Sequence, residues 1–225
     1  FWMYPSENLD TEDYYDQECS WWHTDERGEV YRNRIRKING RSYAFDGIGR
    51  MQTGFVLFDG KSEFVARYEV DDWSSEDFIE GTIYGIEKSD LYLFSPDELN
   101  DGSMQIGKDI AVELEDGVFH FGFASNGKAF GNRNRLQKKE GMYYINGLRL
   151  EADEEYGYGV VKVEDGADAY YQVVDTRGKV IEGKKKIVKD KEGGYLLIIR
   201  NRLVAWCGDE DKPRWRKGEE GTGFY

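Results

Sequence analysis

Four stretches of this sequence repeat one order of residues: an aromatic-rich run, a polar turn that contains glycine, a short second run and a closing glycine. The clearest copies cover residues 43–54, 91–107, 119–131 and 170–183. Two of them share the core Gly-x-Met-Gln-x-Gly, and weaker copies lie at 22–32, 142–150 and 195–208. This repeat constrains the fold more than any other feature, because each unit must bury its apolar side against its neighbours.

The turn glycines set the spacing of the units. Glycines at positions 28, 49, 102, 127, 147 and 178 indicate a period of roughly 20 to 25 residues, with a degenerate unit between 49 and 102. That gap contains residues 71–85, which we interpret as an insertion or the start of a short helix. The expected organisation is an N-terminal segment with the first hairpin repeats (1–60), an irregular insertion or degenerate repeat (61–90) and C-terminal hairpin repeats (91–225).

Residue patterns within the units predict strands. Phe119, Phe121 and Phe123 alternate with Val118, His120 and Gly122, and a period of two is typical of a strand. Asn-Gly and Asp-Gly pairs adopt the positive φ angles of a type I′ turn at low cost. Such turns are therefore predicted at Asn39-Gly40, Asp59-Gly60, Asp116-Gly117 and Asn146-Gly147. The only helix candidates are residues 10–19 and 74–79.

These patterns together predict an all-β fold. A single two-stranded hairpin is marginal in water, whereas a row of hairpins buries the aromatic face of each against the next. We therefore expect a solenoid of stacked β-hairpin repeats with one irregular insertion. The low mean hydropathy of −0.75 suits such a thin structure.

Charge excludes several classes of partner. The net charge is −13, which opposes binding to nucleic acid or to an anionic membrane surface. No stretch is long and apolar enough for membrane insertion. Acidic runs at 71–72, 153–155 and 209–211 leave two interpretations open. In the first, they form a solvated face. In the second, they bind calcium, although none has the spacing of a calcium-binding loop.

The sequence predicts neither an enzyme nor a cofactor. Only His23 and His120 could act as imidazole bases, and no nucleophile elbow, phosphate loop or zinc-protease motif occurs. The two cysteines, Cys19 and Cys207, form no zinc-type pair. In an open solenoid they would also lie too far apart for a disulfide bond.

The repeats resemble the cell-wall-binding repeats of bacterial surface proteins, a group that includes choline-binding modules, glucan-binding repeats and the carbohydrate-binding repeats of large toxins. Residues 38–46 and 49–54 carry the closest match to the family pattern of aromatic strand, turn and Met-x-x-Gly. The resemblance implies an extracellular, cell-wall-associated module. Because the chain starts at Phe1 without an initiator methionine, we expect it to be part of a larger surface protein.

In choline-binding members an aromatic residue after the repeat-ending glycine forms one wall of a cage that binds the cation. Here Phe55 follows Gly54, whereas Lys108, Asn132, Lys184 and Asp209 stand at the other junctions. The resemblance therefore implies a ligand-binding site made by Phe55, Tyr43 and Phe45. The alternative is that all three residues belong to the core.

Two functions remain open. The first is a non-catalytic module that binds cell-wall polysaccharide, teichoic acid or a host glycan, since exposed rings stack on sugars. The second is a structural or protein-interaction scaffold without a small ligand. Two or more solvent-facing rings lining one groove would favour the first, and rings buried between hairpins would favour the second.

Overall fold

The computed structural model describes residues 2–3, 21–96, 101–166, 168–208 and 222–224. The chain divides into two compact units, which are described separately below. Unit 1 comprises residues 1–133 together with Asn146–Leu148, and unit 2 comprises Asn134–Ile145 and Arg149–Tyr225. Within the described ranges no helix has the length and apolar character needed to span a membrane.

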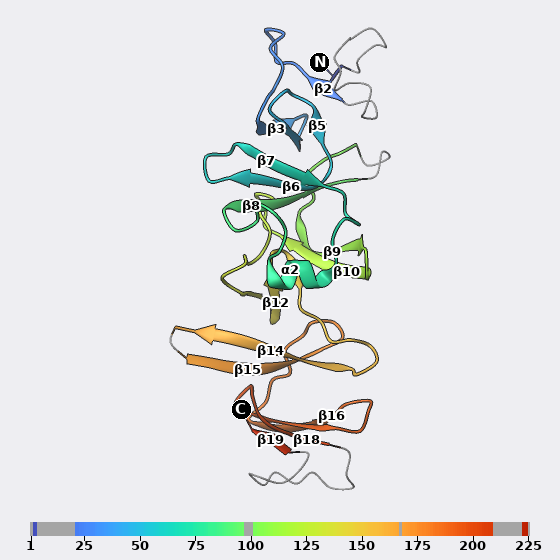
Figure 1. The fold of residues 1–225 in the computed structure, drawn as a ribbon, viewed down its shortest axis with the longest axis vertical. Coiled ribbons are helices and arrows are strands. Elements are labelled where there is room, and N and C mark those ends of the chain that lie inside the picture. The colour runs from blue at the N-terminus through green and yellow to red at the C-terminus, as the bar shows by residue number, and fades with distance from the viewer. Residues whose placement is uncertain (1, 4–20, 97–100, 167, 209–221, 225) are drawn as a thin grey trace. The chain divides into compact units, whose positions relative to one another are not determined.

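Both units are built from short antiparallel strands (Figure 1). The strands that begin in unit 1 are β1 (Trp2–Met3), β2 (Trp22–His23), β3 (Arg34–Ile38), β4 (Arg41–Phe45), β5 (Met51–Gln52), β6 (Gly54–Asp59), β7 (Phe64–Tyr68), β8 (Ser89–Phe94), β9 (Gly107–Leu114), β10 (Gly117–Phe123) and β13 (Leu148–Arg149). Those of unit 2 are β11 (Gln137–Lys139), β12 (Met142–Ile145), β14 (Tyr158–Asp165), β15 (Asp168–Asp175), β16 (Lys185–Lys189), β17 (Tyr195–Ile199), β18 (Arg202–Cys207) and β19 (Thr222–Phe224). The predicted all-β class is thus confirmed in its secondary structure.

One five-residue turn recurs along the chain. In each copy the first residue donates its backbone N–H to the fifth carbonyl, and the fourth residue donates to the first carbonyl, at 2.8–3.3 Å. The fourth residue has a positive φ of 67–103°, which explains why it is glycine in all copies but one. The first residue is aspartate in all copies but one, because its carboxylate accepts N–H groups within the turn. The copies are residues 25–29, 46–50, 59–63, 124–128, 175–179 and 190–194.

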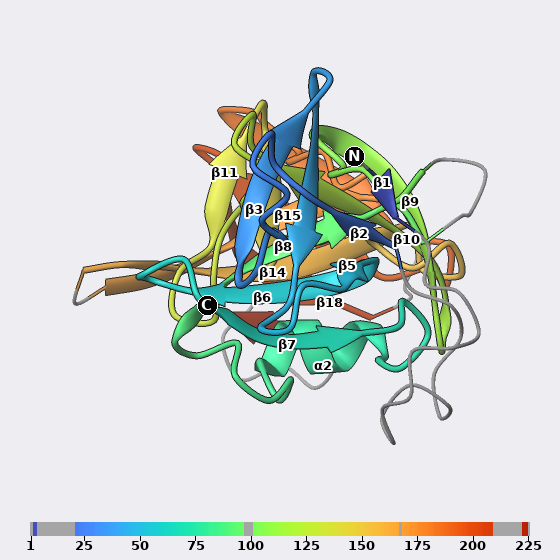
Figure 2. The same cartoon turned by 90° about the horizontal axis from the view of Figure 1, so that it is seen from above.

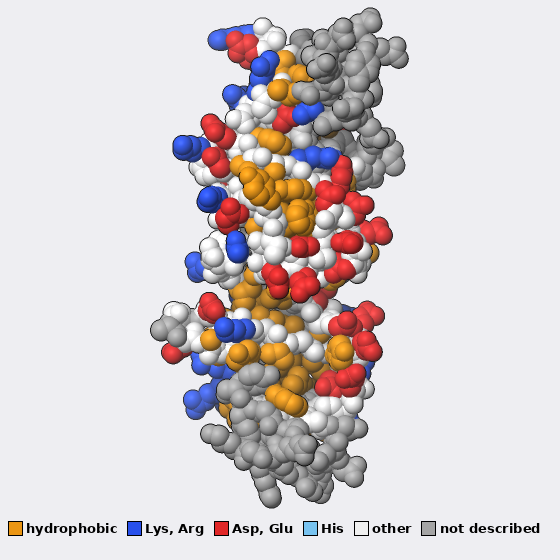
Figure 3. All heavy atoms as spheres, in the orientation of Figure 1, with side chains coloured by type: hydrophobic (Ala, Val, Ile, Leu, Met, Phe, Trp, Pro, Cys, Tyr) orange, Lys and Arg blue, Asp and Glu red, His pale blue; other side chains and the backbone are white. Residues whose placement is uncertain are grey.

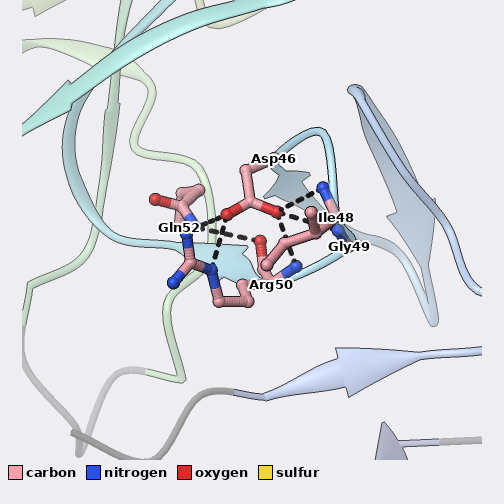
Figure 4. A network of polar contacts seen from close by, with 5 residues as sticks. All are labelled: Asp46, Ile48, Gly49, Arg50 and Gln52. Carbon is pink, nitrogen blue, oxygen red and sulfur yellow. Dashed lines mark hydrogen bonds and ion pairs between the residues drawn. The ribbon is translucent and has the colours of Figure 1, made fainter. Parts of the chain in front are cut away.

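Asp46 occupies the most buried of these turns (Figure 4). Its Oδ1 accepts the backbone N–H groups of Ile48, Gly49 and Arg50 at 2.8–3.0 Å. Its Oδ2 accepts Arg50 Nε at 2.8 Å and Gln52 Nε2 at 3.1 Å. This carboxylate therefore holds both the turn and the side chains that follow it.

After three of these turns, at 46–50, 124–128 and 175–179, the next residue hydrogen-bonds to an earlier segment of the chain. Met51 N–H donates to the carbonyl of Trp21 at 2.7 Å, and Ala129 N–H to that of Leu91 at 2.8 Å, both within unit 1. Within unit 2, Val180 N–H donates to the carbonyl of Gly141 at 2.9 Å. These three turns thus close their own hairpins and also fix them to an earlier segment of the chain.

Unit 1 is layered (Figure 1), and Figure 2 looks along the direction in which its layers follow one another. The middle sheet, β7-β6-β8, has apolar residues on both faces, because successive residues of a strand point to opposite sides. Phe55 and Leu57 of β6 pack into one cluster with Phe121 of β10, whereas Val56 and Phe58 pack into a second cluster with Ala44 of β4. The predicted alternation in β10 is confirmed, since Phe121 and Phe123 are buried and Val118 is exposed.

Unit 2 follows the same rule. β14 and β15 pair along eight residues. Val174 of β15 packs into a cluster with Val161, Val163 and Tyr143, while its neighbour Val173 packs into another with β16–β18 residues. The β15 strand of this hairpin is thus packed on both faces.

The segment between β7 and β8 holds the single helix among the described residues, α2 (Ser75–Glu80). Ser74 caps it, exchanging hydrogen bonds with Asp77, whose carboxylate accepts Ser74 Oγ at 2.7 Å. Phe78 points from α2 into the cluster of Phe55. The expected helix start at 74–79 is therefore confirmed, while the other candidate, residues 10–19, lies outside the described residues.

The predicted hairpin turns are correct in place but only partly in type. Asn39-Gly40 and Asn146-Gly147 have positive φ at both residues, as a type I′ turn requires. At 59–63 the hairpin is closed by the five-residue turn, with positive φ at Ser62 instead. At 116–117 only Gly117 has a positive φ. Asp59 accepts N–H groups of its own turn, whereas Asp116 accepts the backbone N–H and the hydroxyl of Ser75, and neither aspartate adopts the left-handed conformation.

We expect Asp46→Ala to destabilise the protein by about 2–4 kcal/mol, because it leaves buried N–H groups and the Arg50 guanidinium without their acceptor. Asp25→Ala removes the same kind of turn acceptor at a more exposed site and should cost clearly less. Urea unfolding of both variants measures the difference. Equal losses would show that burial of the Asp46 network adds nothing.

We expect Phe55→Ala to lower the free energy of unfolding by about 3–5 kcal/mol, because it opens a cavity in a packed core. The Phe55 ring is 1% exposed and lies 5.0 Å from the Phe78 ring and 5.3 Å from the Phe121 ring, between centroids. Tyr84→Ala, at an exposed ring, is the matched control and should change stability little. A Phe55→Ala variant as stable as the parent would contradict the core assignment.

Candidate functional site

The three residues predicted to form a ligand site do not share one cluster. Tyr43 and Phe45 lie on β4 and pack with Ile38, whereas Phe55 is the second residue of β6 and packs with Phe78 and Phe121. All three are buried. Their ligand-binding role stays a prediction, and their packing matches the alternative that they belong to the core.

Tyr43 is the one of the three that presents a polar group to a partner. Its hydroxyl donates to Asp101 Oδ2 at 2.9 Å, and the same carboxylate forms an ion pair with Arg41. Burial raises the pKa of Tyr43, and the hydrogen bond to Asp101 raises it further. At neutral pH this hydroxyl therefore stays protonated and acts as a fixed hydrogen-bond donor.

A second group of aromatic residues lies in the segment that the sequence indicated as irregular. Tyr68 ends β7, Trp73 precedes α2 and Tyr84 follows it. The Tyr68 and Trp73 rings meet edge to face, with centroids 5.2 Å apart, and the Tyr68 hydroxyl donates to the Tyr84 carbonyl at 2.9 Å. The Tyr84 side chain is 78% exposed. We call these three residues the aromatic surface.

Several acidic residues lie in the same stretch of the chain as the aromatic surface. Figure 3 shows carboxylates gathered beside exposed hydrophobic side chains on one face of unit 1. Burial raises the pKa of the Tyr68 hydroxyl, and the nearby Tyr84, Asp72 and Glu87 raise it further. Exposed acids in this stretch are Glu69, Asp71, Asp72, Glu76, Glu80 and Glu87. The local field therefore disfavours anions and favours neutral or cationic ligands.

The chemistry of the aromatic surface is that of binding. Tyrosine and tryptophan rings stack on the C–H faces of sugars and attract quaternary ammonium groups, and carboxylates accept hydrogen bonds from hydroxyls. The indole Nε1 of Trp73 is buried and has no hydrogen-bond partner in the described part of the chain. The sequence pattern missed this surface because its residues belong to no repeat.

The histidines lie apart from the aromatic surface in the chain. His23 stacks on Tyr31 with ring centroids 5.3 Å apart, and burial lowers its pKa. His120 lies on β10. Among the described residues no three His, Cys, Asp or Glu side chains form a group that could hold a metal ion. The acidic run at 209–211 lies outside these residues, as does Cys19, while Cys207 is buried.

No protein-family model and no curated protein matches this chain. Solved structures do. Over 90% of its length the chain is similar to CbpF, the choline binding protein F of Streptococcus pneumoniae, in complex with ipratropium, with a TM-score of 0.47 and 14% identity. It is similar over 96% of its length to CbpJ of S. pneumoniae, with a TM-score of 0.46 and 13% identity.

A third similar structure is a pneumococcal cell-wall endolysin from phage Cp-1 complexed with choline, matched over 97% of this chain with a TM-score of 0.33 and 14% identity. The chain spans 48% of CbpF, 75% of CbpJ and 40% of the endolysin, so it corresponds to about half of the first structure. Choline-binding repeat proteins, the family that the sequence motifs resemble, are therefore among the solved structures to which this chain is similar.

Proposed function

We propose that this chain is a non-catalytic repeat module of the bacterial cell surface that binds a cell-wall polymer or another carbohydrate. The observation that carries the proposal is the aromatic surface, where the backbone carbonyl of the 78% exposed Tyr84 accepts the hydroxyl of Tyr68, whose ring meets Trp73 edge to face. An exposed tyrosine whose backbone is held by an anchored ring offers a stacking surface at little cost in side-chain entropy.

The acidic residues near this surface limit the class of ligand that it can bind. Glu69, Asp72 and Glu87 would accept hydrogen bonds from sugar hydroxyls and would repel a polyanion at this site. The part of the polymer that contacts this surface is therefore a neutral sugar or a cationic substituent.

The arrangement of hairpins within each unit supports a module of the solenoid type. In each unit one strand, β6 or β15, is packed on both faces, and the residues after the turns at 46–50, 124–128 and 175–179 bond to an earlier segment. We propose that this pattern continues through the chain as one solenoid and belongs to a larger, cell-wall-associated protein. A stack of this kind offers a long surface to a repetitive polymer.

The junction after Gly54 remains a second candidate for the binding site. Tyr43 and Phe45 precede it and Phe55 follows it, and the Tyr43 hydroxyl reaches the ion pair of Arg41 and Asp101. Ligand binding there requires the buried rings to separate. Loss of binding in Phe55→Ala without loss of stability would support this location.

A scaffold without a small ligand is the second candidate function. Its specific support is the burial of the repeat aromatics, since Tyr43, Phe45, Phe55 and Phe121 all pack inside unit 1. On this alternative the module acts as a spacer or an adhesion surface.

We expect the purified chain to bind cell-wall glycans on an array and to bind the best of them in calorimetric titration. Tyr84→Ala should weaken this binding about tenfold or more, because it removes a stacking ring. Tyr156→Ala removes another exposed tyrosine, 44% exposed and in unit 2, and should leave the affinity unchanged.

An array without any bound glycan would refute the binding function and favour the scaffold. Equal loss in the two tyrosine variants would show that the aromatic surface is not the site.

A further inference from the structure

The sheet of unit 2 ends in two very different edge strands. Its strand order is β14-β15-β18-β17-β16, so β14 and β16 each leave one row of backbone groups unpaired by this sheet. Such a row can pair with a strand of another molecule. β16 carries lysine at three of its five positions, so two copies of β16 would bring like charges together. β14 has no such protection, because its eight residues include one lysine.

β14 is regularly paired on its inner side. All eight of its residues pair in register with β15, without a bulge, from Tyr158↔Asp175 to Asp165↔Asp168 (Figure 1). Val161 and Val163 anchor one face in the core of unit 2, and Val160 on the other face is 44% exposed. A straight, fully paired edge strand needs no rearrangement before it accepts a neighbour.

The charges on β14 select one self-pairing register. Lys162 and Glu164 are two positions apart, so they share a face and point their backbone groups to the same edge. Their side chains are 55% and 72% exposed and lie 3.4 Å apart between Lys162 Nζ and Glu164 Oε1. An exposed ion pair of this kind is weak, which leaves both charges available to a second molecule.

We propose that the free edge of β14 is a self-association surface on which a second copy of this chain adds its own β14 in antiparallel orientation. With the two-fold axis at Val163, Lys162 of each copy lies opposite Glu164 of the other, so the dimer gains two opposite-charge pairs. Moving the axis to Lys162 sets lysine against lysine, and moving it to Glu164 sets glutamate against glutamate. The charge pattern thus makes β14 complementary to itself in one register.

Charge reversal on the full chain tests this surface. By sedimentation equilibrium up to about 100 µM, the parent should form a dimer, and either Glu164→Lys or Lys162→Glu should weaken it on the order of tenfold or more. The double variant Lys162→Glu/Glu164→Lys exchanges the partners and should restore dimerisation. Glu182→Lys, the same charge change off the strand, is the control.

Mixing the two single variants distinguishes loss of the charge pairs from misfolding of the variants. The two single variants carry opposite charges at both positions, so mixing them should give a heterodimer tighter than either homodimer. A parent that is monomeric throughout this range, a dimer unaffected by Glu164→Lys, or a mixture that does not associate would overturn the proposal.

Discussion

The backbone hydrogen bond that follows the turns at 46–50, 124–128 and 175–179 is the contact on which the rest of this fold depends. A hairpin alone is only marginally stable in water. The bonds from Met51 to Trp21 and from Val180 to Gly141 attach a hairpin to an earlier segment in a fixed position. Because the donor is a main-chain group, its position depends on the turn and not on the side chain that follows. Met, Ala and Val can therefore occupy this position while the layers keep their order.

The burial of aromatic residues follows from this layering. The aromatic residues that pack the core are therefore different from those that are free to bind a ligand. A strand such as β6, with Phe55 on one face and Phe58 on the other, has no free face to offer a ligand. Exposed rings are then expected where the regular pattern breaks. In unit 1 that place is the segment around α2, where Tyr84 is exposed. Irregular segments on a rigid frame are a common place for binding residues.

Much of the fold could be predicted from the sequence, because its signals are local. Period two in β10, the Asn-Gly turn at 39–40 and the helix start at Ser74 each depend on neighbouring residues alone. The aromatic surface could not be predicted from the sequence, because its side chains come close to one another only through the positions of β7 and α2 in the fold. The turn at 59–63 also escaped local reasoning, since aspartate can either adopt positive φ itself or accept the N–H groups that follow it, and here Asp59 does the latter.

The closing bond of the turns has a consequence for how such a chain can change its length. Ser95 N–H donates to the Ser103 carbonyl at 2.9 Å, the same bond that joins the first and fifth residues elsewhere, although here more residues lie between them. The following Met104 still donates to Ser42 at 2.8 Å. Insertions between the closing residues thus leave the frame in place, since a longer loop adds little entropic cost. Turns of this kind are natural entry points for new sequence, both in evolution and in engineered grafts.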